Sequence, residues 1–265
     1  GAYHAIASHF TLSDEPATVV MPTGSGKTAV LVMAAFALRA ERVLVITPSR
    51  LVREQIAEEF AKLSTLRELG VVDAGLTAPR VRRLEKMVRH KAEWTELADW
   101  DVVVTTPSAS SPSLKEVPPA PEGLFDVVLV DEAHHSPAAT WAALMQAFPS
   151  ARLVLFTATP FRQDRRELPG QLVYVYPLGR AQQDGVFGQV SYVAVEPDGD
   201  GQSDVAVARK AEGVFAEDRA AGLDHRLMVR TDRKNRADEL LGIYEEHTGL
   251  HLAVVHSRYS LRHVR

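Results

Sequence analysis

The chain has 265 residues, of which 46% are hydrophobic and 24% charged, with no cysteine and a formal net charge of −4. This length and composition allow one or two domains with well-formed cores, and the absence of cysteine excludes disulfides and thiolate metal sites. The slightly negative charge excludes a basic coat over the whole protein, so any contact with nucleic acid has to be a local surface.

The first part of the chain alternates predicted strands with predicted helices. After a helix that ends near Phe10, runs of β-branched and other apolar residues predict buried strands at residues 18–20, 42–47, 101–106, 125–130 and 152–156. Between them we predict helices at residues 27–39, 50–63, 79–97 and 138–148, a short strand at 71–72 and a loop at 107–123. This alternation predicts an α/β fold with a doubly wound parallel sheet, whose ligands bind at the carboxyl ends of its strands.

The pattern changes after residue 177, and we predict a domain boundary at residues 177–188. Beyond it a second series begins, with predicted strands at residues 189–195, 226–230 and 252–256 and helices at residues 204–221, 233–247 and from residue 260 onward.

A cluster of basic residues falls within the predicted helix at residues 79–97. Its members are Arg80, Arg82, Arg83, Lys86, Arg89 and Lys91. Such a cluster is usually a solvated helix face, and contact with nucleic acid or a partner is the alternative.

A glycine-rich turn joins the first predicted strand to the first long helix, and its residues are Pro22, Thr23, Gly24, Ser25, Gly26, Lys27 and Thr28. Its two glycines let the backbone adopt positive φ, so successive N–H groups can surround a phosphate. Lys27 would reach the β- and γ-phosphates, Thr28 would place its hydroxyl on Mg²⁺, and the helix adds its positive N-terminal end. We therefore expect residues 23–28 to bind a nucleotide.

An acidic pair, Asp131 and Glu132, follows the predicted strand at residues 125–130. Asp131 would hold Mg²⁺ through water, and Glu132 would orient and deprotonate the water that attacks the γ-phosphate. Lys27, Asp131 and Glu132 are thus the expected catalytic residues. Taken alone, the two carboxylates could simply cap the following helix; their combination with the phosphate loop favours the catalytic interpretation.

The phosphate loop, Asp-Glu-Ala-His at residues 131–134 and Thr-Ala-Thr-Pro at residues 157–160 occur in an order that resembles the DEAH-type helicases of superfamily 2. The resemblance implies ATP and Mg²⁺ as cofactors and two RecA-like lobes, which we expect at residues 1–178 and 179–265, the second being incomplete. It also implies that His134, Thr157 and Thr159 couple the state of the nucleotide to the grip on nucleic acid.

Two other predicted strand ends resemble motifs Ia and Ib of these helicases, at residues 47–55 and 105–108. The resemblance implies contact with the sugar-phosphate backbone through Ser49, Arg50, Thr106, Pro107 and Ser108. A helix cap at Ser49 and an ordinary turn at Thr106 are the simpler alternatives.

Residues 161–164 and the doubled histidine at residues 134–135 are similar to helicases of restriction and phage-defence systems. This similarity implies DNA rather than RNA as the partner, together with other subunits of a defence complex. The lack of cysteine is compatible with a reducing cytosol, and a cytoplasmic location is expected. The longest apolar run, residues 29–38, is about half as long as a membrane span, so no membrane partner is expected.

Two alternatives stay open: an RNA helicase of the same superfamily, and a nucleotide-gated clamp or sensor that does not translocate. In this superfamily, arginines late in the second lobe reach the γ-phosphate, and no such motif occurs before Arg265. These 265 residues alone are therefore expected to hydrolyse ATP poorly.

Overall fold

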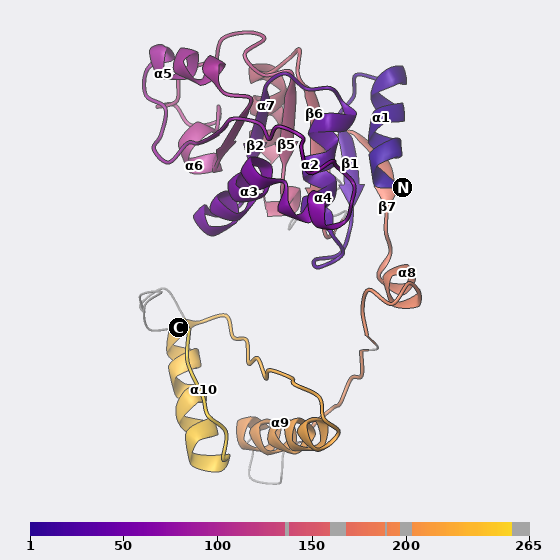
Figure 1. Ribbon diagram of the computed structural model, residues 1–265. Helices are drawn as coiled ribbons and strands as arrows, with labels where there is room; N and C mark the ends of the chain where they lie inside the picture. Colours follow the sequence, from indigo (N-terminus) through magenta and orange to yellow (C-terminus); the bar gives the residue numbers. More distant parts are fainter. Residues whose placement is uncertain (136–137, 160–167, 189, 197–202, 256–265) are drawn as a thin grey trace. The chain divides into compact units, whose positions relative to one another are not determined.

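The computed structural model describes residues 1–265 except 136–137, 160–167, 189, 197–202 and 256–265 (Figure 1). The chain divides into two compact units, unit 1 at Gly1–Gln189 and unit 2 at Val190–Arg265. This division lies just beyond the segment in which the sequence places a boundary. The assignment of unit 2 as a second RecA-like lobe stays a prediction.

Unit 1 is built on a seven-stranded sheet in the order β3-β4-β2-β5-β6-β1-β7, and every pair of neighbouring strands is parallel. The strands are β1 (Ala17–Val20), β2 (Val43–Ile46), β3 (Val81–Arg83), β4 (Val102–Thr105), β5 (Val127–Val130), β6 (Arg152–Thr157) and β7 (Gln171–Val175). Strands β1, β2, β4 and β5 are buried along their whole length, as their apolar sequences predict. The predicted parallel α/β sheet is confirmed.

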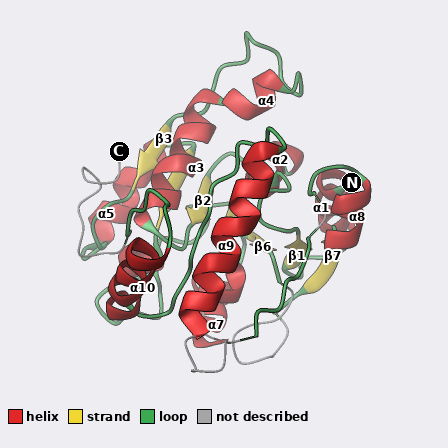
Figure 2. Ribbon diagram, turned by 90° about the horizontal axis from the view of Figure 1, so that it is seen from below, coloured by secondary structure: helices red, strands yellow, loops and turns green. Residues whose placement is uncertain are grey.

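Helices cover both faces of this sheet (Figure 1 and Figure 2). They are α1 (Ala2–Leu12), α2 (Lys27–Ala37), α3 (Arg50–Lys62), α4 (Ser64–Glu68), α5 (Lys91–Thr95), α6 (Pro107–Ser110) and α7 (Ala138–Ala147), with 3₁₀ turns at Glu96–Asp99 and Ala133–His135. Helix α8 (Leu178–Gln183) follows β7 and lies beyond the end of the sheet (Figure 1). The alternation of side chains along β2 separates two cores. Val43 and Val45 pack with residues of α1, α2 and α3, whereas Leu44 and Ile46 pack with Trp94 of α5.

The predicted helix at residues 79–97 is wrong over its first part, where residues 81–83 form an edge strand, and is confirmed only at its end, in α5 and the 3₁₀ turn after it. β3 pairs with β4 alone, and the backbone N–H of Arg80 donates to the Asp101 carboxylate at 2.7 Å, which fixes the start of the pairing. An edge strand has one open side, so its charged residues stay in solvent and give no apolar signal. The predicted strand at residues 71–72 is also wrong: the N–H groups of Val71 and Val72 donate to the Leu66 carbonyl in a turn.

Strand β7 and helix α8 were not predicted from the sequence. β7 is the other edge of the sheet; Gln171, Leu172 and Val175 are exposed, and the two residues between them are partly buried. It begins immediately after Gly170, which passes close to the segment before β1.

Gly170→Ala is expected to lower the free energy of unfolding by about 3–4 kcal/mol, because a new side chain forces the backbone apart. Gly170 has a φ of +87°, and a Cβ there would lie 2.0 Å from the carbonyl oxygen of Pro16. The same oxygen accepts the hydrogen bond from Gln171 N at 2.7 Å that begins the β1–β7 pairing. Urea unfolding measures the loss.

The matched control is Gly123→Ala, at a residue that also has positive φ, +69°, but no atom within 4 Å of the new Cβ. Only backbone strain opposes that change, and it costs about 1 kcal/mol. Equal losses for the two variants would contradict the steric explanation.

Unit 2 contains the helices α9 (Ser203–Ala220) and α10 (Lys234–His247), both close to their predicted bounds. The ion pair between Arg236 and Asp204, at 2.5 Å, joins them. The described parts of the three predicted strands, residues 190–195, 226–230 and 252–255, form no strand. A strand needs a neighbour for its backbone hydrogen bonds, and none of these segments has one among the described residues of unit 2.

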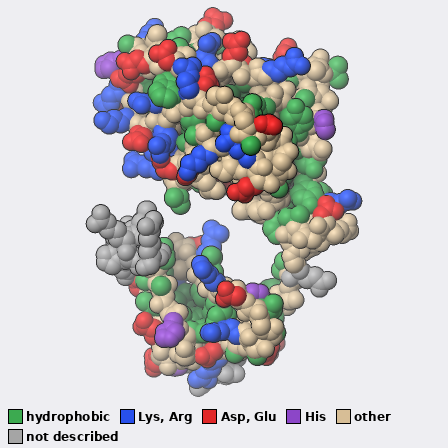
Figure 3. All heavy atoms as spheres, viewed as in Figure 1, with side chains coloured by type: hydrophobic (Ala, Val, Ile, Leu, Met, Phe, Trp, Pro, Cys, Tyr) green, Lys and Arg blue, Asp and Glu red, His purple; other side chains and the backbone are tan. Residues whose placement is uncertain are grey.

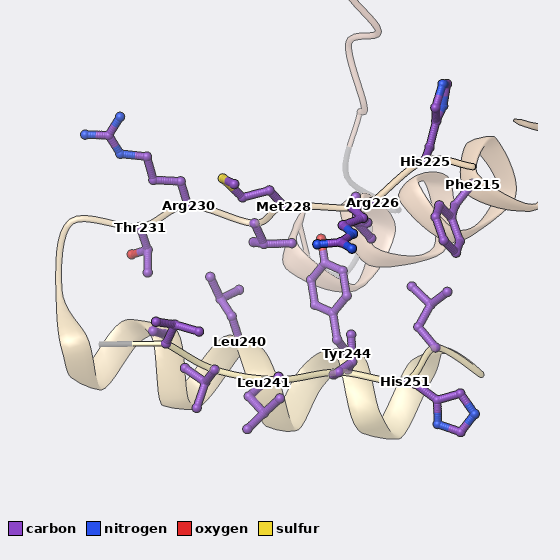
Figure 4. A pocket seen from close by; sticks show the side chains of 18 of the residues that line it. Phe215, His225, Arg226, Met228, Arg230, Thr231, Leu240, Leu241, Tyr244 and His251 are labelled. Carbon is purple, nitrogen blue, oxygen red and sulfur yellow. The ribbon is translucent and has the colours of Figure 1, made fainter. Parts of the chain in front are cut away.

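A hollow of about 960 Å³ lies within unit 2, between α10 and the irregular segments at residues 225–233 and 249–255. Tyr244 points from α10 toward the segment that carries Arg226 and Met228 (Figure 4). The lining is mostly apolar and lacks a pair of convergent carboxylates, so the chemistry expected from the sequence belongs to unit 1. In the part of the chain that the structure describes, every helix is too short or too polar to span a membrane.

Candidate nucleotide site

The phosphate loop lies at the carboxyl end of β1 and leads directly into α2. Gly24 and Gly26 have φ values of +84° and +87°, which a residue with a side chain rarely adopts. Ser25 closes the loop, since its backbone N–H and its hydroxyl both donate to the Pro22 carbonyl, at 3.2 and 2.7 Å. Thr23, Gly24 and Gly26 are exposed, and Thr28 is half-buried at the start of α2.

The side chain of Lys27 is buried between two carboxylates. Its ammonium group forms an ion pair with Glu132 Oε1 and lies 3.6 Å from Asp131 Oδ1. Only 8% of the Lys27 side chain and 9% of that of Asp131 is exposed. The topology produces this meeting, because the carboxyl ends of β1 and β5 lie at the same edge of the sheet, with β6 between them.

The two carboxylates differ in their surroundings. Burial raises the pKa of Asp131, and the nearby ammonium of Lys27 opposes that shift. Glu132 has a φ of +49°, and its Oε2 atom is buried without a hydrogen bond from the described residues. A strained backbone and an unsatisfied buried oxygen at one residue are typical of a functional site rather than of a helix cap.

A chain of polar contacts links Glu132 to the end of β6. His134 Nδ1 lies 3.4 Å from Glu132 Oε2 and 2.9 Å from the Thr157 hydroxyl. That hydroxyl donates to the Thr159 carbonyl at 2.7 Å and accepts from Thr159 N at 3.1 Å. Because the single hydroxyl proton is used in this way, His134 has to donate from Nδ1, which fixes its tautomer. Of the predicted Thr-Ala-Thr-Pro segment, Pro160 lies outside the described residues.

The residues that resemble motifs Ia and Ib follow two neighbouring strands, β2 and β4. Ser49 caps α3 by accepting from Val52 N at 3.3 Å, and Arg50 is exposed on the first turn of that helix. Thr106 is buried, and its hydroxyl lies 3.0 Å from that of Ser108.

These two turns are joined by backbone hydrogen bonding. Thr47 N donates to the Thr105 carbonyl at 2.9 Å. Helix α6 begins at Pro107, two residues after Thr105. The structure therefore brings the five residues predicted to contact nucleic acid to one edge of the sheet, and their contact with nucleic acid stays a prediction.

Phe187 is a neighbour of the phosphate loop that the sequence did not indicate. A Cβ placed on Gly24 would lie 3.4 Å from the Phe187 ring. Helix α8 ends in a Schellman motif, in which Val186 N donates to the Ala181 carbonyl at 2.9 Å around Gly185, with a φ of +73°. This cap turns the chain back toward the loop. The one sign of this cap in the sequence is Gly185, which follows the short helix α8.

The residues at this site fit a magnesium-bound nucleoside triphosphate. Lys27 supplies a cation for phosphate oxygens, the Thr28 hydroxyl and the Asp131 carboxylate supply oxygen ligands, and the phosphate loop begins a helix. The described residues hold no cluster of three or more metal-ligating side chains. Magnesium needs none here, because it commonly binds one or two protein groups together with phosphates and water.

Comparison with known proteins gives a family match over residues 1–162, to the type III restriction enzyme res subunit. One similar solved structure is a nuclease-deletion mutant of the type ISP restriction-modification enzyme LlaGI in complex with a DNA substrate mimic, with a TM-score of 0.47 and 16% identity over 82% of this chain and 22% of that chain. Another is the UvsW helicase from bacteriophage T4, with a TM-score of 0.39 and 11% identity over 60% of this chain and 52% of that chain. This chain thus spans only part of each, and no curated protein matches it.

The family match covers more than half of the chain. It includes the phosphate loop, the two carboxylates and the two threonines at the end of β6. The parallel sheet around them is the RecA-like arrangement that the sequence predicts. The chain belongs to the family of the type III restriction enzyme res subunit.

Proposed function

We propose that this protein is an ATP-dependent DNA translocase of a restriction or phage-defence system. The observation that carries the proposal is the meeting of Lys27 with Asp131 and Glu132 beside the phosphate loop. DNA is favoured over RNA by the description of the family as a subunit of a restriction enzyme, since restriction acts on DNA. Such a protein would work in the cytoplasm, together with other subunits of the system.

Each residue of the site has a role in this proposal. ATP with Mg²⁺ would supply the phosphoryl group whose hydrolysis drives movement. The backbone of residues 23–26 would surround the phosphates and Lys27 would neutralise them, while Thr28 and Asp131 would hold the metal. Glu132 would orient the attacking water and accept its proton.

The contacts of His134 would make the site a switch. A change in the position or charge of Glu132 alters the field at His134 Nδ1, which is bonded to Thr157 at 2.9 Å and through it to Thr159. In this proposal the end of β6 would then adjust the grip of residues 49–50 and 106–108 on the nucleic acid.

The test is nucleic-acid-stimulated hydrolysis of ATP by the full-length protein, with the late arginines of the second lobe supplied, because residues 1–265 alone are expected to hydrolyse ATP poorly. Duplex DNA is expected to raise the rate of phosphate release about tenfold or more, which is a barrier lower by about 1.4 kcal/mol, and RNA of the same sequence is expected to have little effect. In a second measurement, ATP should drive displacement of a third strand from triplex DNA.

The other outcomes of this test identify the alternatives. Equal stimulation by RNA would replace the DNA translocase with an RNA helicase. Stimulated hydrolysis without displacement of the third strand would indicate a nucleotide-gated clamp. No effect of any nucleic acid on hydrolysis would contradict all three functions.

A further inference from the structure

The structure divides the predicted basic cluster into two groups. In the first group every side chain has a partner. Arg80 forms an ion pair with Asp101 at 3.0 Å, Arg83 forms one with Glu54, and the Arg82 guanidinium lies 5.7 Å from the centre of the Trp100 ring. Hydrogen bonds from Arg80 lower the pKa of Asp101, and hydrogen bonds from Arg53 and Arg83 lower that of Glu54. Arg80 and Arg83 therefore already have carboxylate partners.

The second group consists of Lys86, Arg89 and Lys91, which follow β3. All three are exposed, and none forms an ion pair or ring contact with any residue that the structure describes. Glu93 is the nearest acid in sequence on α5, and its carboxylate accepts from the backbone N–H of Arg89 at 3.1 Å, not from its guanidinium. These cations are therefore available for a ligand.

The loop that carries Lys86 and Arg89 leaves the sheet at the same edge as motif Ib. β3 runs parallel to β4, so both strands end on the same side. Leu84 N donates to the Val104 carbonyl at 2.9 Å, and Val88 N donates to the Ala109 carbonyl on α6 at 3.0 Å. Val88 is completely buried between the two cations, which fixes the loop against the predicted nucleic-acid contacts.

Helix α3, which begins with motif Ia, is joined to the same loop. Arg53 is 5% exposed and donates from Nη1 to the Leu84 carbonyl at 3.1 Å. The turns after β2, β3 and β4 are thus held together at one edge. Lys and Arg side chains gather on the side of unit 1 that carries α3, α5 and α6 (Figure 3).

We propose that Lys86 and Arg89 bind the sugar-phosphate backbone of the nucleic acid, and so extend the contact surface beyond residues 49–50 and 106–108. This inference rests on the proposed function, because it needs a nucleic acid on motifs Ia and Ib. Exposed cations without a protein partner form ion pairs with phosphates and release the counterions held there. Contacts of this kind add affinity and fix position but carry no sequence preference.

The experiment compares two double variants with the same loss of charge. Lys86→Ala with Arg89→Ala is expected to weaken binding to a labelled duplex about tenfold. It should also reduce the slope of log K against log salt by about 2, since each lost phosphate contact removes about 0.9. Arg80→Ala with Arg83→Ala removes two cations that already have carboxylate partners, and is expected to change neither quantity appreciably.

The possible failures are distinguishable. A parent protein that binds neither duplex nor single-stranded nucleic acid overturns the proposed function and this inference together. A parent protein that binds DNA, with the same affinity and salt slope in the Lys86 and Arg89 variant, overturns this inference alone. Equal weakening by both double variants would also overturn it, because net charge rather than the position of these side chains would then control binding.

Discussion

Replacing Lys27 with alanine is expected to abolish binding of Mg²⁺–ATP, with Kd raised about a hundredfold or more. The Lys27 side chain is 8% exposed, and its ammonium lies against Asp131 and Glu132. Without the Lys27 ammonium, the triphosphate would approach two carboxylates whose negative charge no other side chain of residues 22–28 offsets. The loss of one charge-assisted contact costs about 3 kcal/mol, which corresponds to about a hundredfold in affinity. Titration with a fluorescent ATP analogue in the presence of Mg²⁺ measures the change.

The matched control for this prediction is Lys62→Ala. Its side chain is 62% exposed and forms an ion pair with Glu58 on the same helix, so the charge change is equal but occurs at the surface. Circular dichroism confirms that each variant is folded, and Lys27→Gln serves as a second variant if alanine prevents folding. Unchanged affinity for nucleotide in a folded Lys27 variant would contradict the assignment of the site.

The buried strands and the phosphate loop could be predicted because their physical requirements are local. A strand covered on both faces has to be apolar throughout, as β2 and β5 are. The loop needs glycines at the two residues with positive φ, Gly24 and Gly26. The meeting of Lys27 with Asp131 then follows from topology, because parallel strands end at one edge of a sheet.

The edges of the sheet could not be predicted, because pairing over a long distance decides them. Val81–Arg83 is strand β3 since β4 offers backbone partners and Asp101 anchors its start. The charged residues that flank Val81–Arg83 in the sequence would by themselves favour a helix. The segment at residues 226–230 presents the opposite case: its sequence is typical of a strand, but no neighbouring strand pairs with it among the described residues. In both segments, the presence or absence of a neighbouring strand decides the structure, whatever the local sequence favours.

The finer properties of the site also depend on contacts that sequence spacing does not contain. The positive φ of Glu132, the direction of the His134 hydrogen bond and the approach of Phe187 to Gly24 all come from the folded arrangement. The same holds for the basic residues, since only the structure separates the paired Arg83 from the exposed Lys86.

Changing Glu132 to glutamine is expected to leave binding of Mg²⁺–ATP nearly intact while phosphate release falls by about 10²–10⁴-fold. The amide oxygen can still accept from Lys27, whose charge for the triphosphate remains in place. The amide cannot take the proton of the attacking water. The NH₂ group of the new glutamine would also face His134 Nδ1, which lies 3.4 Å from Glu132 Oε2 in the unchanged protein. Because both groups are hydrogen-bond donors, they could not bond to each other. The variant therefore separates hydrolysis from binding and weakens the link to Thr157.

Glu58→Gln is the control, because it removes the same charge from a side chain that is 63% exposed. Nucleotide affinity and single-turnover phosphate release have to be measured on the same preparations. If the Glu132 variant loses affinity as severely as the Lys27 variant, Glu132 holds the nucleotide rather than the water. If its phosphate release is unchanged, the base is another group. Retained binding with lost hydrolysis is the one result that assigns proton transfer to Glu132, because loss of the phosphate contact would remove both activities together.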